Sequence, residues 1–111
     1  MKLPNSEQAI IEESKLVGYL LNLSHPDGWS KAKFFFELGF NRNNPQRLEE
    51  ALKQHASQTN ILSIQETPFG LKYVLEGNLV SIFGKPYKVR TIWFIGYNES
   101  IPKLVTAYPV N

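Results

Sequence analysis

The chain has 111 residues, 42% of them hydrophobic and 20% charged, which is the size and composition of one folded domain rather than a disordered or low-complexity segment. Its formal net charge of +2 excludes the strongly basic pattern of a nucleic-acid coat protein but allows a polyanionic ligand. The lack of cysteine excludes a disulfide framework and a thiolate metal site, and two histidines alone do not build a typical structural zinc site.

The N-terminal stretch MKLPNSEQAII has a proline and early glutamates where a signal peptide would have an apolar region. No apolar run approaches the roughly 20 residues that a membrane-spanning helix needs. We therefore expect a cytoplasmic protein without membrane contact.

The first half of the chain predicts helices. Residues 7–14 hold three acidic residues around a short apolar triplet, which fits either an edge strand or a lead-in to a helix. The stretch KLVGYLLN (15–22) then predicts a short helix, followed by a loop at the breaker cluster 24–28. The helical spacing is set by Leu16, Tyr19, Leu20 and Leu23.

A second helix is predicted over 31–38, with Ser30 as its N-cap and Gly39 as its C-terminal stop. Its apolar stripe consists of Phe34, Phe35 and Leu38. A third helix opens at the Asn-Pro pair 44–45 and continues through LEEALKQHA. The positions of its inward stripe repeat at helical spacing: Leu48, Ala51, Leu52 and His55/Ala56.

The second half changes to β-rich runs: ILSIQE, LKYVLEGNLVSIF, YKVRTIWFIGY and KLVTAYPV, separated by short turn sequences. Short turns between such runs favour antiparallel neighbours, so the simplest assembly is a four-stranded meander with the helices packed on one face. The prediction is one α+β domain over 1–111, with a helical part at about 14–59 and an antiparallel sheet at about 60–109.

The third predicted strand carries an arginine, Arg90, in an otherwise apolar context. Alternation along a strand puts Arg90 on the face that also holds Lys88, Ile92 and Phe94, opposite the face of Val89, Thr91, Trp93 and Ile95. Two interpretations stay open: Arg90 is a solvent-face residue beside Lys88, or that face binds phosphate through the planar guanidinium fork.

The last predicted strand places Leu104, Thr106 and Tyr108 on one face. Tyr108 fits half-buried sheet packing. The two hydroxyls of Thr106 and Tyr108 also fit a ligand face beside Arg90.

The HPDGWSK stretch raises the same question for His25. A histidine before a proline in a loop is commonly a solvated turn residue. Lys31, however, lies in the first turn of a predicted helix, where free backbone N–H groups and a lysine together attract an anion. A histidine beside such a site could serve as general acid or base on a phosphodiester.

Other polar residues give weaker indications. Lys33 falls on a different side of the second helix from Lys31 and is interpreted as solvated, and His55 is expected at the surface or boundary. No P-loop, dinucleotide-binding, zinc-protease or nucleophile-elbow motif is present, and the acids are not grouped as in a magnesium site. We expect metal-free chemistry without a cofactor.

The blocks KLVGYLLN, HPDGWSKAKFFFELGF, ETPFGLKYVLEG, VRTIWF and LVTAYP resemble a bacterial family of small domains found at the C-termini of polymorphic toxins and as free-standing proteins. The resemblance runs from about Lys15 to Pro109. That family in turn resembles the barnase-EndoU-colicin-RelE ribonuclease-toxin superfamily, which implies N-terminal helices followed by an antiparallel four-stranded sheet.

The resemblance implies metal-independent RNA cleavage with the substrate's own 2'-hydroxyl as nucleophile. The implied site residues in its blocks are His25 as general base or acid, Lys31 and Arg90 as stabilisers of charge on the phosphoryl oxygens, and Thr106 and Tyr108 as orienting or proton-transfer groups. Thr91 of the VRT block faces away and is interpreted as structural. Trp29 departs from the family, where a small residue is common, and with Lys88 is a candidate substrate-binding residue.

A ribonuclease of this kind implies an RNA substrate and a cognate antitoxin or immunity protein that covers the basic site. Two alternatives remain. A non-catalytic module that binds RNA or protein would use Arg90, Lys88 and Tyr108 for affinity and would not need His25, and a purely structural domain would need none of them. The sequence does not indicate an oligomeric state.

Overall fold

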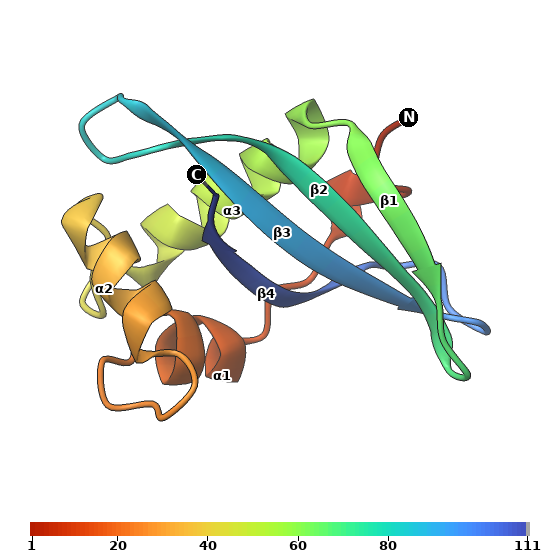
Figure 1. The fold of residues 1–111 in the computed structure, drawn as a ribbon, viewed down its shortest axis with the longest axis horizontal. Helices are drawn as coiled ribbons and strands as arrows, with labels where there is room; N and C mark the ends of the chain where they lie inside the picture. The colour runs from red at the N-terminus through yellow and green to blue at the C-terminus, as the bar shows by residue number, and fades with distance from the viewer. Residues whose placement is uncertain (111) are drawn as a thin grey trace.

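The computed structural model describes residues 1–110, which form N-terminal helices packed on a four-stranded antiparallel sheet, the predicted α+β class (Figure 1). The elements in chain order are η1 (Ser6–Gln8), α1 (Glu13–Lys15), η2 (Leu16–Leu20), α2 (Trp29–Glu37), α3 (Pro45–Gln58), β1 (Ile61–Glu66), β2 (Gly70–Val80), β3 (Pro86–Gly96) and β4 (Lys103–Pro109). Within this range no helix has the length and apolar character needed to cross a membrane.

The sheet is the predicted meander, in the order β1-β2-β3-β4 with antiparallel neighbours. Helix α3 packs across one face of the sheet and lies behind it in Figure 1, whereas α1 and α2 flank β4. Within residues 1–110 no helix covers the other face of the sheet over β2 and β3, and we call it the open face.

The alternation predicted for β3 is confirmed. Val89, Thr91, Trp93 and Ile95 are buried on the face toward α3, and the residues between them point to the open face and are half-buried or exposed. The core that forms against α3 includes Phe35, Leu52, Leu75 and Trp93.

The prediction for β4 was wrong at Leu104. A bulge lies opposite the Ile92–Trp93 step of β3, where Ile92 pairs with Thr106 but Trp93 pairs with Leu104, so Val105 is an extra residue. The bulge turns Leu104 to the core face, where it is buried. Thr106 and Tyr108 keep the predicted open face.

The N-terminal region also differs from expectation. The stretch 7–14 is neither an edge strand nor a helix throughout: after η1, Ile10 forms a short parallel bridge to β4, with Ile10 N donating to Pro102 O (2.9 Å) and Leu104 N donating to Ile10 O (3.0 Å). These bonds cover part of the outer edge of β4.

Ser30 is not an N-cap, because α2 already begins at Trp29 and Gly28 occupies the capping position. The backbone N–H groups of Asp27 and Gly28 donate hydrogen bonds to Nδ1 of His25, at 3.0 and 3.1 Å. Gly39 does end α2, with φ at 95°, a backbone conformation that glycine adopts readily.

His55 is fully buried, and its prediction as a surface or boundary residue was wrong. Its Nε2 lies 3.0 Å from the carbonyl oxygen of Val89 and 3.2 Å from that of Gly77, so this nitrogen carries a proton. The hydroxyl of Thr91 reaches Nδ1 at 3.4 Å and accepts the indole N–H of Trp93 at 2.9 Å. His55 is therefore part of a buried polar network that joins α3 to β3.

Candidate active site

Tyr19, Lys31 and Thr106 form the centre of the candidate site, where η2 and α2 meet β4. Lys31 Nζ donates a hydrogen bond to the hydroxyl of Tyr19, and that hydroxyl is 3.2 Å from Thr106 Oγ1. Tyr19 and Thr106 are 87 positions apart in the chain. The helices therefore place a phenol and an ammonium against the open face of β4.

Arg90 and Tyr108 extend the site across the open face. They are directly opposite each other on β3 and β4, and the guanidinium carbon of Arg90 lies 5.9 Å from the centre of the Tyr108 ring. Lys31 Nζ lies 5.8 Å from the same ring centre, so the ring of Tyr108 adjoins both cations.

A carboxylate holds Arg90 from the other side. Glu76 on β2 accepts a hydrogen bond from Arg90 Nη2 at 2.8 Å. Tyr108 first and Glu76 second raise the pKa of Arg90, so the guanidinium stays charged. Its Nε is buried without a hydrogen-bond partner in residues 1–110, so it is not accessible to a ligand. The guanidinium has five N–H donors in all, and the donors of Nη1 and Nη2 that Glu76 does not accept are those left for an anion.

His25 touches this cluster through its ring. The ring packs edge-on against Tyr19 with centroids 5.0 Å apart, while Nδ1 accepts the amides of Asp27 and Gly28. A nitrogen that accepts two N–H groups carries no proton, so in the neutral ring the proton is on Nε2. His25 therefore presents an N–H donor at Nε2.

Gly28 brings the loop close to Tyr19. A Cβ atom at position 28 would lie 2.9 Å from both Cδ1 and the carbonyl oxygen of Tyr19, closer than a side chain tolerates. The glycine is needed for this approach, and with His25 it confines the Tyr19 ring.

Positive charge surrounds Tyr19. The ammonium groups of Lys31 and Lys15 lie 5.0 and 5.3 Å from its ring centre. Burial alone would raise the pKa of Tyr19, but the hydrogen bonds of Lys31 and Thr106 and the two nearby positive charges outweigh it and lower the pKa below the usual 10.0. The phenolate form is therefore favoured relative to an ordinary tyrosine.

A surface cavity of about 370 Å³ opens beside the cluster, lined by Ser30, Lys31, Tyr108 and Pro109. The two predicted substrate-binding residues do not line it. Trp29 precedes Ser30 in α2 and is 54% exposed, and Lys88 is exposed on β3, two residues from Arg90.

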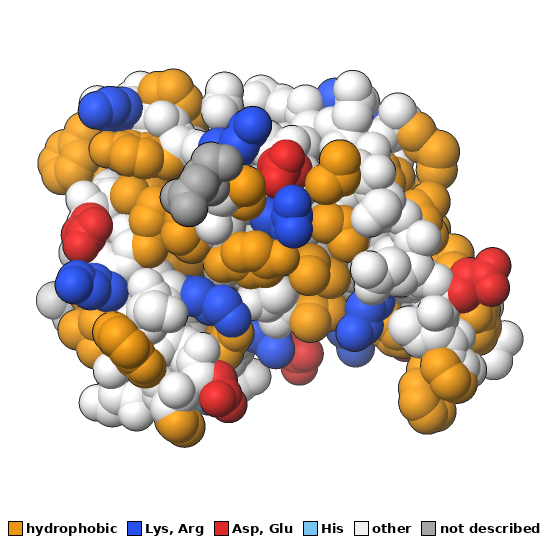
Figure 2. Space-filling view, in the orientation of Figure 1, with side chains coloured by type: hydrophobic (Ala, Val, Ile, Leu, Met, Phe, Trp, Pro, Cys, Tyr) orange, Lys and Arg blue, Asp and Glu red, His pale blue; other side chains and the backbone are white. Residues whose placement is uncertain are grey.

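The open face around the site is basic. In Figure 2, Lys and Arg side chains lie across the face that α3 does not cover, with hydrophobic side chains between them. The strand register puts Lys88 opposite Asn78 and puts Phe94 between Lys72 and Lys103. An extended polyanion could follow this face.

The predicted residues Lys31, Arg90, Thr106 and Tyr108 thus gather at one place, with His25 at its margin. The sequence interpretation missed Tyr19, Lys15 and Glu76. Tyr19 was assigned to the apolar spacing of the first helix, although a tyrosine has a polar tip that needs a partner when it is partly buried. The phenol hydroxyl was therefore the feature of the sequence that could have identified Tyr19 as a site residue.

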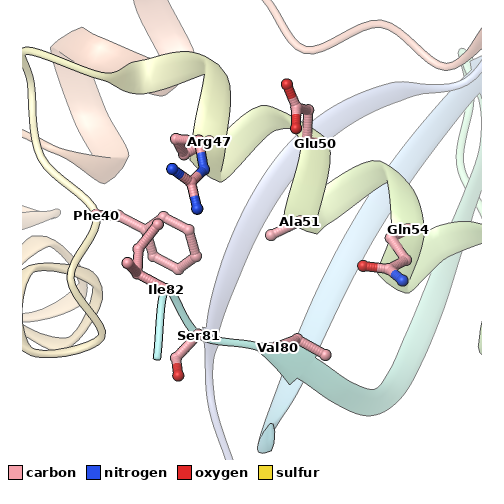
Figure 3. A pocket seen from close by; sticks show the side chains of 8 residues that line it. All are labelled: Phe40, Arg47, Glu50, Ala51, Gln54, Val80, Ser81 and Ile82. Atoms are coloured by element: carbon pink, nitrogen blue, oxygen red, sulfur yellow. The ribbon is translucent and has the colours of Figure 1, made fainter. Parts of the chain in front are cut away.

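Another cavity, of about 180 Å³, lies between α3 and the end of β2 (Figure 3). Its lining includes Phe40, Ile82 and the oppositely charged, exposed side chains of Arg47 and Glu50, and none of the predicted site residues. In residues 1–110 no group of three or more His, Asp or Glu side chains could hold a metal ion.

Comparisons with known proteins give a family and a fold. Residues 2–111 match the family model described as "Domain of unknown function (DUF6883)". A chain in the solved structure of a contact-dependent growth inhibition toxin–immunity protein complex from Klebsiella pneumoniae 342 is similar in fold, with a TM-score of 0.73 at 18% identity, over 96% of this chain and 97% of that chain. No curated protein matches the sequence.

Proposed function

The chain belongs to the DUF6883 family, and we propose that it is a toxin-type, metal-independent endoribonuclease that cleaves RNA by attack of the 2'-hydroxyl. The observation that carries this proposal is the convergence of Lys31, Arg90, Thr106 and Tyr108 from α2, β3 and β4 at one place on the surface, beside a cavity that Lys31 and Tyr108 line. Two cations beside two hydroxyls are the groups that bind a phosphodiester and stabilise charge on its oxygens.

In this proposal each residue has a distinct role. Lys31 and Arg90 neutralise the phosphoryl oxygens as negative charge develops, because the two cations lie 5.8 and 5.9 Å from the centre of the same ring, that of Tyr108. The hydroxyls of Thr106 and Tyr108 orient the phosphate. Trp29 and Lys88, both exposed, contact the flanking nucleotides by stacking and by charge.

The basic open face supports RNA as the substrate class. Cations at Lys72, Lys88 and Lys103 lie in the same sheet face as Arg90, with half-buried Phe94 between two of them. Phosphates interact with such cations, and bases stack on exposed aromatic rings.

A protein partner follows from the same chemistry. The structurally similar chain comes from a toxin–immunity protein complex, and the two cations of this site, with a single carboxylate paired to Arg90, favour the toxin role for the present chain. Its proposed partner is an immunity protein or antitoxin with an acidic surface that covers Lys31 and Arg90.

The test is RNA cleavage by purified protein freed of any bound partner, with total RNA and transfer RNA, with and without EDTA. We expect cleavage that EDTA does not stop, that leaves 2',3'-cyclic phosphate ends, and that fails at a 2'-deoxy nucleotide. The variants Lys31→Met and Arg90→Met should slow it strongly. A folded wild-type protein that leaves both RNAs intact would refute the ribonuclease proposal.

A second candidate is a non-catalytic RNA-binding module, which is favoured by the extent of the basic open face beyond the cavity. It predicts salt-dependent RNA binding without cleavage, and binding that depends on Lys88 and Arg90 but not on His25.

A further inference from the structure

Tyr19 is connected to more of the candidate site than any residue predicted from the sequence. Its hydroxyl bonds with Lys31 and Thr106, its ring adjoins the ammonium of Lys15, and the ring of His25 packs against it. Such a position leaves Tyr19 either as a structural link between η2 and β4 or as a reacting group.

The neighbouring histidine is poorly arranged to accept a proton. His25 Nδ1 is engaged by the amides of Asp27 and Gly28, and Nε2 carries the ring proton. To act as a base, His25 would have to give up both amide bonds, which hold the turn that begins α2. The tyrosine has no such obstacle, because its oxygen accepts from Lys31 and is stabilised by that bond as it ionises.

From these contacts we propose that Tyr19 is the catalytic residue that accepts the proton of the 2'-hydroxyl, and that His25 and Gly28 are positioning residues that hold its ring. The inference rests on the proposed ribonuclease function and names the base of that reaction. In this proposal the HPDG turn positions the Tyr19 ring and takes no part in proton transfer.

The proposed step balances as follows. The phenolate oxygen of Tyr19 takes the 2'-hydroxyl proton, the 2'-oxygen forms a bond to phosphorus, and the bond from phosphorus to the 5'-oxygen breaks. The leaving 5'-oxygen takes a proton from water, and the hydroxide so formed removes the proton from Tyr19. The products are a 2',3'-cyclic phosphate and a 5'-hydroxyl.

The charges around Tyr19 support this role. The ammonium groups of Lys31 from α2 and Lys15 from α1 face its ring, and the ring of His25, from the loop before α2, packs against it. The balance of burial, hydrogen bonds and positive charge lowers the pKa of Tyr19. Lys31 thus serves two purposes: it stabilises the phenolate, and it borders the cavity at Tyr108.

The first experiment compares cleavage rates of the wild type, Tyr19→Phe and the matched control Tyr87→Phe over a range of pH. We expect Tyr19→Phe to slow cleavage by about 100-fold or more, since general acid–base groups contribute on that scale. The wild-type rate should rise with pH and level off below the ordinary tyrosine value of 10.0, and Tyr19→Phe should lose this rise. Tyr87→Phe, which removes a hydroxyl outside the site, should behave as the wild type.

The second experiment separates position from chemistry at His25. The side-chain oxygen of an asparagine can accept hydrogen bonds from the backbone N–H groups two and three residues ahead, but asparagine does not titrate. We expect His25→Asn to retain at least about a third of the wild-type rate and His25→Ala to lose roughly 10-fold, with the alkaline rise preserved in both. An inactive but folded His25→Asn would overturn the positioning role.

The outcomes separate the two proposals. If the wild type cleaves RNA and needs Lys31 and Arg90, but Tyr19→Phe cleaves within about threefold of the wild type, the function stands and Tyr19 is not the base. If no RNA is cleaved, both proposals fail. Should Tyr19→Phe not fold, Lys31→Met supplies the readout, because loss of the ammonium must move the alkaline rise to higher pH. An unmoved rise would then refute the role of Tyr19.

Discussion

The two polar networks of this protein lie on opposite faces of β3 and differ in how their charges are used. On the core face, His55, Thr91 and Trp93 are buried, and these three side chains form a network that holds a neutral imidazole and no ion. On the open face, Lys31 and Arg90 share one aromatic ring, and one carboxylate contacts Arg90. The first network therefore serves stability, and the second is available for a ligand.

The largest expected effect is the loss of stability when the core network is disrupted. Trp93→Ala removes a fully buried ring and leaves the Thr91 hydroxyl without its indole donor, so the free energy of unfolding should fall by about 3–5 kcal/mol. Chemical denaturation measures this loss, followed by far-ultraviolet circular dichroism because the backbone signal does not depend on the removed tryptophan. A loss below about 1 kcal/mol would mean that the core face is not packed as the structure shows.

The opposite result is expected for the open face. Lys31→Met keeps the apolar stem over Tyr19 but removes the charge, so stability should change by less than about 0.5 kcal/mol, while RNA affinity should fall roughly 10-fold with a smaller salt slope. The exposed Lys33→Met, two residues along α2, is the matched control. Equal losses of affinity in both variants would show that only net charge matters.

The sequence predicted the elements that depend on local pattern. The alternation along β3 places Arg90 and Thr91 on opposite faces whatever the rest of the chain does, and the short turns favour antiparallel pairing. The same local rules failed at the β-bulge of β4, where one residue is left without a partner on β3. The bulge at Val105 reverses the side on which Leu104 points, and no pattern in LVTAYP marks it.

Contacts between distant residues were beyond local rules. Tyr19 was assigned to the apolar stripe because its hydroxyl finds Thr106 only after the helices dock on β4. His55 was expected near the surface because its acceptors, the carbonyls of Gly77 and Val89, belong to strands that begin well after α3. Lys31, Arg90, Thr106 and Tyr108 lie together because each strand or helix fixes the face on which its own residues lie, and the packing of α2 against β4 then joins those faces.

A smaller effect is expected from the titration of the core network. Burial, the largest cause, lowers the pKa of His55 below its ordinary 6.5, despite the opposing hydrogen bonds to Val89 and Gly77. Below about pH 6.5 the unfolded chain takes up a proton at this histidine that the folded protein resists. The free energy of unfolding should therefore be highest above pH 6.5 and decline as the pH falls toward the lower, folded pKa of His55.

Denaturation at several pH values between about 5 and 7.5 checks this decline, and His25→Asn is the control because it removes the other histidine. The decline should persist in that variant. If it disappeared, the core network would not be the source of the pH dependence.

The smallest effect is expected at Glu76, the carboxylate that pairs with Arg90 on the open face. Glu76→Gln removes the carboxylate that holds Arg90 while keeping an amide oxygen of similar shape, and this partly exposed pair contributes at most about 1 kcal/mol to stability. Release of Arg90 and the gain of one positive charge should strengthen RNA binding a few-fold, most clearly at low salt. Fluorescence anisotropy with a short single-stranded RNA, at two salt concentrations, measures the change. If binding weakens instead, Glu76 is needed to aim Arg90 at the phosphate, and the carboxylate belongs to the site as an orienting group.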